Sequence, residues 1–514
     1  MRRHLTLSMS FAGLLAGGLA APVLAAPSTQ SPPAGPADWS LSVLALTLLL
    51  PAGLIFLNVA ALTEERAVAA ATGGLVAWGL VVVAYFVAGF AFQFGGIAVV
   101  HNVSGLSGLY WEYSLLDTTW GTGWGMIGLR GFLMLGDAAT PSALALFLSQ
   151  LPFLGLAALI PYFTLQGRAP RWVILLASLL MGSLVYPLIG NWAWGGGWLA
   201  NLGRSLAQGH GLIDAGGSGQ AALTGAAAAL AALLVFRPRP ATDAAPTSPP
   251  SGEPEAVPMP PAHLPLLGLL GAVLMAVGWT ATTYMLHLPT AVGVSPAPGA
   301  ANLMLGAFGG ALAAGIYSWF TTSGLDPLMA ARGWVAGLVV AAAGAPFVPA
   351  WSALAGGLVI GLLLPPLVFL FDRVLRLDDS GGALGTFGLP ALLGLLLPAL
   401  LSDGRYGVGW NGMGVDKFLG VAGQGVSGWL VAPGFAADWP GQIYAQCVGM
   451  VAIFIWSFGL SGLLLRLLAG IIHAWERTGL EFGAPPQPVT EVEVAEPDES
   501  IMPTSPREVS QEHL

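Results

Sequence analysis

Long apolar runs separated by short polar stretches dominate this chain. Each run has about 20 residues, which is the length that crosses the hydrocarbon core of a bilayer as a helix. The runs lie near 41–62, 68–94, 142–165, 172–191, 213–236, 263–286, 300–320, 328–348, 352–372, 383–401 and 440–470. No run sustains the alternation of apolar and polar residues that a membrane barrel requires. The pattern therefore predicts an all-α polytopic membrane protein with about eleven transmembrane helices.

The composition supports a membrane protein. Of the 514 residues, 55% are hydrophobic and 8% are charged, whereas about a quarter of an ordinary soluble domain is charged. The 72 glycines and 18 tryptophans fit this class, because glycine lets membrane helices approach closely and tryptophan favours the membrane interfaces. No basic face predicts nucleic-acid binding. Cys447 is the only cysteine, which excludes an intrachain disulfide and a thiolate metal cluster.

Both ends of the chain and one internal segment differ from the apolar runs. Residues 1–26 read as a signal peptide, because two arginines precede a short apolar stretch and a run of small residues. Residues 27–39 would then form an external leader. The predicted membrane domain, 40–472, contains a proline-rich cytoplasmic linker at 237–261. Residues 473–514 form an acidic cytoplasmic tail whose end is predicted to be disordered.

The distribution of basic residues predicts the orientation. With the N-terminus outside, the loops after odd-numbered spans and the tail lie in the cytoplasm. On that side fall Arg66, Arg168, Arg171, Arg237, Arg239, Arg332, Arg373, Arg376 and Arg477, against Arg130, Arg204, Arg405 and Lys417 outside. This bias follows the positive-inside rule. We therefore expect a multi-pass protein of the cell inner (plasma) membrane with an external N-terminus and a cytoplasmic C-terminus.

One carboxylate, Asp214, stands at the start of the fifth span among glycines. A charge in a membrane segment is costly and needs a reason. Asp214 either caps a helix beginning at about Ala215 by accepting hydrogen bonds from its first amides, or shapes an entrance that attracts cations; both can hold together. Asp214-Ala-Gly-Gly is echoed by Asp379-Ser-Gly-Gly five spans later. Because each half has an odd number of spans, the echo predicts two inverted five-helix repeats plus a final long helix.

Several motifs, in order, resemble the ammonium transporter family (Amt/Mep/Rh). They are PAGLIFLNVAAL in the first span, AGFAFQFGG ending the second, WAWGGG followed by DAGG, VGW in the sixth, RVLRLDDSGGALGTFG entering the tenth and IYAQCVGMVAIFIWSF in the last. The resemblance covers most of the membrane region and rests on the order and spacing of these motifs. It implies a homotrimer in the lipid bilayer. Each subunit would capture ammonium at an external vestibule and pass it through a narrow apolar channel.

The resemblance assigns three residues to the outer, substrate-binding site. Trp194, in WGGG, matches the vestibule tryptophan, which turns an aromatic face toward the cation. Asp214 matches a buried aspartate that shapes and stabilises the capture site without touching the ion. Phe153, in SQLPF, matches the outer of two gating phenylalanines. The alternative for a tryptophan or phenylalanine in a membrane helix is ordinary packing.

Two departures from the family concern the gate and the vestibule. The inner gating phenylalanine aligns with Thr282, which we expect to line the pore. The vestibule serine falls near Leu286, beside His287.

Two further departures remove the paired pore histidines, which in the family line the channel and relay the proton shed by ammonium. The first histidine aligns with Ala221, if one residue is deleted after the aspartate, and has Gln220 beside it; the second aligns with Phe387. Imidazole donates and accepts hydrogen bonds and carries a proton near neutral pH, whereas alanine offers nothing and phenylalanine only a ring face. Gln220 would restore one donor and acceptor but no proton shuttle. Phe387 would line the channel or plug it.

Other chemistry finds no support in the sequence. The seven histidines are scattered, without HExxH or a pair at helical spacing, which argues against a metal site. GxxxxGK[ST] is absent, so phosphate binding has no support. Lys417 lies in an external loop with no partner that would lower its pKa. We therefore expect neither an enzyme nor a cofactor.

Three functional interpretations stay open on the sequence. The first is an ammonium-transporter-like channel with altered pore chemistry that passes neutral ammonia or a similar small molecule. The second is a non-conducting homologue that acts as a membrane sensor or regulatory subunit. The third, an unrelated secondary transporter, would show broken half-helices at the midplane. The segment Glu476–Glu481 resembles one through which cytoplasmic nitrogen-signalling proteins act, or is simply the amphipathic end of a long helix.

Overall fold

The computed structural model describes residues 41–60, 62, 64–121, 123–237, 263–285, 294–379 and 381–478. The predicted signal peptide and leader, nearly all of the linker, the segment with Leu286 and His287, and the tail beyond Thr478 lie outside the described residues. The predictions for those segments are therefore left as they stand.

Helices make up most of the first half of the chain. Its elements are α2 (Leu41–Thr47), α3 (Leu49–Val59), α4 (Glu64–Ala84), η2 (Tyr85–Gly89), α5 (Phe90–Phe94), α6 (Ile97–Val100), β1 (Glu112–Tyr113), α7 (Asp117–Trp120), β2 (Ile127–Gly128), η3 (Phe132–Met134), η4 (Gly136–Ala138), α8 (Pro141–Leu165), α9 (Arg171–Leu180), η5 (Met181–Val185), α10 (Tyr186–Ala193), α11 (Leu202–Leu206), η6 (Ser218–Leu223) and α12 (Thr224–Val235). The strands β1 and β2 pair in antiparallel fashion.

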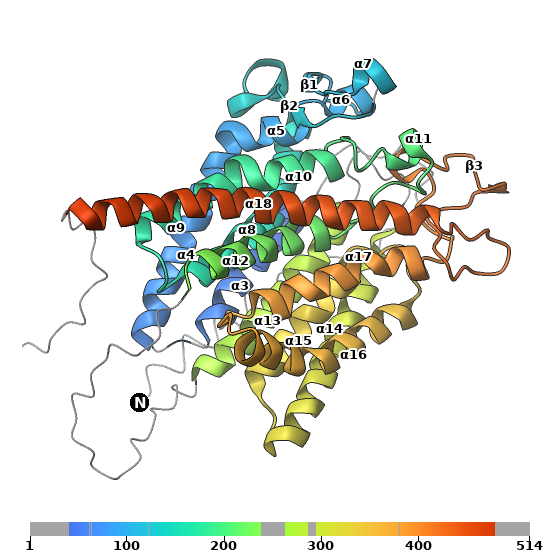
Figure 1. The fold of residues 1–514 in the computed structure, drawn as a ribbon. Coiled ribbons are helices and arrows are strands. Elements are labelled where there is room, and N and C mark those ends of the chain that lie inside the picture. Colours follow the sequence, from blue (N-terminus) through green and yellow to red (C-terminus); the bar gives the residue numbers. More distant parts are fainter. Residues whose placement is uncertain are drawn as a thin grey trace, which may run out of the picture.

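Helices also make up most of the second half of the chain. Its elements are α13 (His263–Thr282), η8 (Thr283–Met285), α14 (Pro296–Thr322), α15 (Pro327–Ala342), α16 (Ala350–Phe369), η9 (Leu370–Val374), η10 (Ala383–Gly388), α17 (Leu389–Leu401), η11 (Trp410–Gly412), β3 (Lys417–Phe418), β4 (Val421–Ala422) and α18 (Gly441–Thr478). The strands β3 and β4 form a second antiparallel pair. The long last helix, α18, runs along the whole bundle, as Figure 1 shows.

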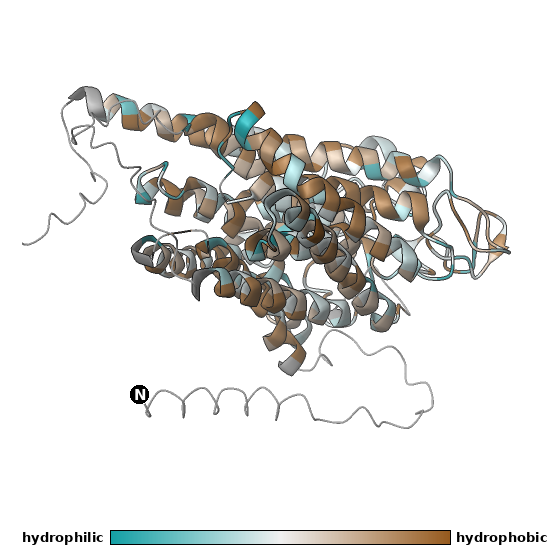
Figure 2. Cartoon of the chain, turned by 90° about the horizontal axis from the view of Figure 1, so that it is seen from below, coloured by the Kyte–Doolittle hydropathy of each residue, from teal (hydrophilic) through white to brown (hydrophobic). Residues whose placement is uncertain are grey.

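The arrangement of the helices confirms an all-α membrane fold. Hydrophobic residues cover most of each helix, and hydrophilic residues concentrate in loops and near helix ends (Figure 2). Within the described residues, nine helices are long and apolar enough to cross a membrane. Two shorter apolar helices, Val43–Val59 and Pro327–Ala342, coincide with the first and eighth predicted spans. The fold class is therefore as predicted, whereas the count of eleven spans stays a prediction.

The two ends of the bundle differ. The short elements α11 and β3 lie at one end, here called the loop end, and α18 finishes at the other, here called the tail end (Figure 1). The loops of the two halves are tied together at the loop end, because Asn411 donates a hydrogen bond to the carbonyl of His210 over 2.8 Å. The backbone N–H of His210 in turn donates to Gln442 Oε1 at the start of α18.

Glycine allows α14 and α15 to pack backbone against backbone. A β-carbon on Gly337 of α15 would overlap the carbonyl of Gly306 on α14, and one on Gly310 of α14 would overlap the carbonyl of Gly333 on α15. Small residues permit this approach between membrane helices. Any larger side chain would push the two helices apart.

We expect Gly337→Val to lower the melting temperature of the detergent-purified protein strongly, because overpacking costs about 1–3 kcal/mol and a clash with backbone costs more. Thermal unfolding followed by size-exclusion chromatography measures the effect. Gly79→Val on α4 is the matched control, because a β-carbon on Gly79 meets nothing within 4 Å. Equal melting temperatures for the two variants would contradict the close packing.

Candidate functional site

Three segments of the first half of the chain meet at Trp194. The indole N–H of Trp194 donates a hydrogen bond to the backbone carbonyl of Asp214, with an N···O distance of 2.9 Å. The ring of Phe153, on α8, packs nearly perpendicular to the indole, with ring centroids 5.0 Å apart. Both aromatic side chains are 4% exposed. The structure thus brings together the three residues assigned to the outer site, although their role there stays a prediction.

Asp214 lies in a buried turn, and its carboxylate caps the N-terminus of the next helix. Its Oδ2 accepts hydrogen bonds from the backbone N–H groups of Gly219 and Gln220, at 3.0 and 2.7 Å. The helix begins at Ser218, not at about Ala215 as predicted from the sequence. The reason is Gly217, whose φ of +80° is a left-handed conformation that a helix cannot continue through. The capping role of Asp214 is confirmed.

Asp379 caps the N-terminus of the helix η10 in the same way. Its Oδ1 and Oδ2 accept hydrogen bonds from the backbone N–H groups of Ala383 and Leu384, each at 2.8 Å. Gly382, before the helix, has a φ of +68°. Each aspartate precedes a six-residue π-helix, η6 or η10. The echo between Asp-Ala-Gly-Gly and Asp-Ser-Gly-Gly therefore corresponds to two equivalent local structures, but only Asp379 has an arginine, Arg332, nearby.

The helix α13 is hydrogen-bonded to the turn that follows Asp214. The indole N–H of Trp279 donates to the carbonyl of Gly216 over 2.8 Å. Thr282, aligned with the inner gate, is 2% exposed and donates to the carbonyl of Trp279 over 2.6 Å. The sequence analysis included Trp279 in the VGW motif but gave it no role; the side chain has no exposed surface. Its signal was a tryptophan well inside an apolar run, away from the interfaces that tryptophan prefers.

Ala221 and Phe387, which the sequence resemblance aligns with the pore histidines, lie on the two π-helices η6 and η10, which contact each other. Ala221 has no exposed surface and Phe387 is 1% exposed. A side chain without exposed surface borders no space wide enough for a water molecule. No water-filled channel therefore passes Ala221 in this conformation. Gln220 is also buried, but its amide reaches toward α10, where a β-carbon on Gly190 would lie 2.7 Å from Gln220 Nε2.

A buried polar network lies close to the outer site. The Tyr85 hydroxyl donates to Gln93 Oε1 over 2.8 Å, and Gln93 Nε2 donates to Gln150 Oε1 over 2.9 Å. The Tyr186 hydroxyl donates to the same Gln150 oxygen over 3.1 Å. None of the four side chains has exposed surface. Gln150 is one turn before Phe153 on α8, so the network joins η2, α5, α8 and α10. The sequence signal was a glutamine inside each of two apolar runs.

A carboxyl group without a hydrogen-bond partner lies in the excursion between α6 and α8. Both carboxyl oxygens of Glu112, in β1, are buried and accept no hydrogen bond from the described residues. Gly125 makes room for the carboxyl group, because a β-carbon there would overlap Glu112 Oε2. Burial, and secondly the nearby Asp117, raise the pKa of Glu112 from 4.5 to about 7. This group is therefore about half-charged near neutral pH.

The chemistry available at the outer site is that of aromatic faces and backbone carbonyls. Such groups bind a small cation through the negative face of a ring and through carbonyl dipoles. In the part of the chain that the structure describes, no three His, Cys, Asp or Glu side chains gather as a metal site would require.

Known proteins resemble this chain in sequence. A sequence profile described as the Ammonium Transporter Family matches residues 38–478. Ammonium transporter Amt2 of Archaeoglobus fulgidus is 27% identical over 359 residues, which cover 68% of this chain and 70% of that protein. Ammonium transporter Amt2 of Haloferax mediterranei is 28% identical over 373 residues, covering 70% of this chain and 73% of that protein.

Solved structures share the fold. The crystal structure of Candida albicans Mep2 matches with a TM-score of 0.63 and 19% identity, over 87% of this chain and 85% of that chain. A protein described as a sensor Amt protein matches with a TM-score of 0.63 and 21% identity, over 85% of this chain and 93% of that chain. At these identities the likeness concerns the fold.

We expect Glu112→Gln to stabilise the protein at pH 8 and to change little at pH 4.5. The raised pKa means that stability is lost as the pH rises from 4.5 to about 7, because the buried carboxylate must then be charged. The neutral amide avoids this loss, which is roughly 1–2 kcal/mol after solvent screening. Melting temperatures across this pH range measure the effect. Asp137→Asn, at a side chain that is 81% exposed, is the control; a Gln variant less stable than wild type at pH 8 would contradict the interpretation.

Proposed function

Because the chain belongs to the ammonium transporter family, whose members are transporters and not enzymes, we propose that it captures ammonium at Trp194 and passes neutral ammonia, or a similar small molecule, through a conduit of altered chemistry. The observation that carries this proposal is the junction of Trp194, Phe153 and Asp214. Family membership also sets aside an unrelated secondary transporter.

The outer site supports cation capture because its indole is held in a fixed orientation. The hydrogen bond to Asp214 and the contact with Phe153 prevent Trp194 from rotating. A cation over such a ring gains about 0.5–2 kcal/mol. The Asp214 carboxylate is used differently, since its Oδ2 accepts two backbone N–H groups. It steadies the turn and adds negative charge nearby without contacting the ion.

The proposed conduit favours a neutral molecule. An ammonium ion that enters an apolar segment loses its hydration, which costs several kcal/mol or more. Ala221 and Phe387, which replace the paired histidines, have no atom that accepts a proton. The proton therefore stays on the loop side when ammonia enters, and passage moves no net charge.

A second candidate function is a non-conducting homologue that acts as a membrane sensor or regulatory subunit. The observation that favours it is the burial of Ala221 and Phe387, at 0% and 1% exposed, because passage then requires these side chains to move. The outer site would bind ammonium in either case. Uptake of methylammonium into vesicles separates the two candidates, since the sensor binds without uptake.

We also propose the surroundings that the resemblance implies. The protein would form a homotrimer in the cell inner membrane, with the loop end and N-terminus outside and the C-terminus in the cytoplasm. The bias of arginines toward the predicted cytoplasmic loops supports this orientation. The segment Glu476–Glu481 is the proposed contact for a cytoplasmic nitrogen-signalling protein.

We expect Trp194→Ala to weaken ammonium binding by about tenfold, because it removes the aromatic face that the cation contacts. Isothermal titration of the purified protein with ammonium measures the dissociation constant. Trp429→Ala, which removes a loop-end tryptophan that is 57% exposed, is the matched control. An unchanged dissociation constant for Trp194→Ala would remove this residue from the capture site.

We expect Phe387→His combined with Ala221→His to raise methylammonium uptake into vesicles, because the pair restores two proton-accepting side chains. Phe387→Ala tests separately whether the phenylalanine ring blocks the pore, since alanine opens space without supplying a proton acceptor. Uptake that rises in both variants indicates a steric block. If neither variant takes up more than wild type, Phe387 does not limit passage.

A further inference from the structure

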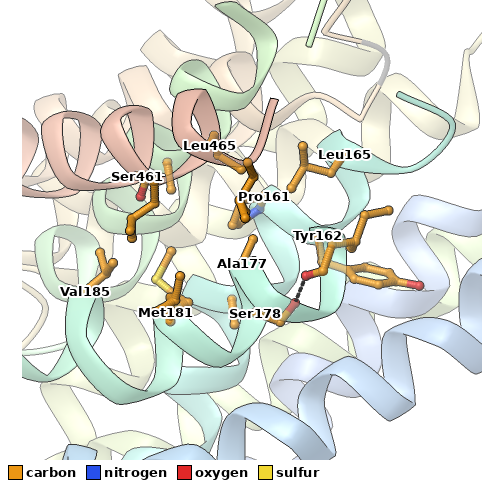
Figure 3. Close-up of a pocket in the computed structure, with 15 residues that line it drawn as sticks. Pro161, Tyr162, Leu165, Ala177, Ser178, Met181, Val185, Ser461 and Leu465 are labelled. Atoms are coloured by element: carbon orange, nitrogen blue, oxygen red, sulfur yellow. Dashed lines mark hydrogen bonds between the residues drawn. The ribbon is translucent and has the colours of Figure 1, made fainter. Parts of the chain in front are cut away.

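The polar groups near the tail end of the bundle are satisfied, even beside a cavity. A cavity of about 30 Å³ lies there between α8, α9 with η5 and α18 (Figure 3). Of the hydroxyls in its lining, that of Tyr162 donates to the carbonyl of Ala70 over 3.2 Å, and that of Ser178 to the carbonyl of Ile174 over 2.9 Å. Glu112 is the opposite case, because neither carboxyl oxygen accepts a hydrogen bond from the described residues.

Glu112 lies in the excursion between α6 and α8, with its carboxyl group between two glycines. A β-carbon on Gly96 would lie 2.6 Å from Glu112 Oε2, and one on Gly125 would overlap the carboxyl group. The space therefore fits the carboxyl group closely, and no backbone N–H points at its oxygens. An uncharged carboxyl group is tolerated there, whereas a carboxylate has lost its water without gaining a donor.

The charged groups nearest to Glu112 do not stabilise its carboxylate. Asp117 of α7 acts on it electrostatically and, as a second acid, opposes its ionisation. The guanidinium of Arg130, which follows β2, is used elsewhere. It lies 5.4 Å from the centroid of the Tyr110 ring and 3.9 Å from a carboxyl oxygen of Asp137.

The other elements around Glu112 add no charge in the range in which it titrates. His101, just after α6, is uncharged there, because burial and secondly Arg204 lower its pKa to about 4. The turn at 95–96, the strand β2 and the segment 195–198 contain no charged residue. The protonation of Glu112 therefore decides whether this part of the excursion carries an uncompensated buried charge.

The segment around Gly125 connects the excursion to the outer site. The carbonyl of Gly125 accepts a hydrogen bond from the backbone N–H of Trp198 over 3.1 Å. The next carbonyl, of Met126, accepts one from the indole N–H of Trp192 over 2.9 Å. Trp192 and Trp198 lie on either side of Trp194 in the sequence. A movement of Gly125 and Met126 therefore changes the support of the outer site on both sides.

We propose that the excursion is a pH-sensitive clamp on the outer site, which loosens when Glu112 loses its proton. The protonated side chain fits between Gly96 and Gly125, and both tryptophan hydrogen bonds are made. The carboxylate draws the segment 123–126 away from the bundle toward water, which weakens these bonds. The clamp does not depend on whether the outer site captures ammonium.

The direction of the pH dependence follows from the raised pKa of Glu112, which is about 7 in the closed form, against 4.5 when the group is hydrated. The closed form is fully favoured below pH 4.5. Its advantage is lost as the pH rises to about 7, and above that it changes no further. The outer site is therefore held firmly at acidic pH and loosely at alkaline pH.

Hydrogen exchange of the full-length protein, measured by mass spectrometry, tests this proposal. Wild type and Glu112→Gln are compared at the same pH, so that the intrinsic exchange rates are equal. At pH 8 we expect the amides of residues 108–129, and that of Trp198, to exchange about tenfold faster in wild type, because its clamp opens more often. At pH 4.5 the two proteins should exchange alike.

Two further variants separate charge from side-chain fit. Asp117→Asn leaves Glu112 in place and removes the charge that opposes its ionisation, so exchange at pH 8 should be roughly threefold slower than in wild type. Asp137→Asn, at an exposed carboxylate of the same excursion, is the control and should match wild type.

The proposal is overturned if wild type exchanges no faster than Glu112→Gln and Asp117→Asn at pH 8. It is also overturned if the excursion changes while Trp198 keeps one rate in all variants, because the excursion would then not be coupled to the outer site. A difference of equal size at pH 4.5 would likewise overturn it, since charge would not be the cause.

Discussion

The structure depends on capping the N-termini of helices that begin inside an apolar core. The first N–H groups of a helix have no partner within the helix, and a lipid-embedded core offers no water to replace one. Asp214 and Asp379 supply the acceptors from the preceding turns. Each turn can therefore enter the interior of the protein, and the π-helices η6 and η10 can begin there.

The aromatic groups of the outer site take their positions from one of these turns. Because the Asp214 carboxylate holds the turn, the carbonyls of Asp214 and Gly216 point toward neighbouring helices. Trp194 at the end of α10 and Trp279 of α13 each donate an indole N–H to one of these carbonyls. The local demand for a helix cap thus decides how two distant tryptophans are oriented. A change in the cap would reach the aromatic site through the backbone.

The sequence predicted the parts of this structure that depend on local patterns. Apolar runs located the helices, and Asp-x-Gly-Gly located both caps, although Gly217 moved the first helix start to Ser218. The motif order also identified Phe153 and Trp194 as neighbours of Asp214. These features could be predicted because they depend on residues close together in the sequence or on the resemblance to a known family.

The remaining contacts could not be predicted because they depend on which helix faces meet. In the helix Ser218–Val235, 83% of the residues are buried. A helix buried on all sides has no periodic pattern of apolar residues that would show which face contacts a given neighbour. The sequence therefore shows that Gln93 and Gln150 are polar residues within apolar runs, but not that they bond to each other. Likewise, the sequence shows that Glu112 is an acidic residue but not that it packs against Gly96 and Gly125.

The bond between Gln93 and Gln150 has a consequence for how the chain is made. These side chains are 57 residues apart, and a ribosome that adds about 5–20 residues per second needs about 3–11 s to synthesise that interval. During this time the amide N–H group of Gln93 lacks Gln150 as its acceptor, and lipid does not replace it. The hydrogen bond thus favours release of these two helices into the lipid together, after the helix with Gln150 has emerged.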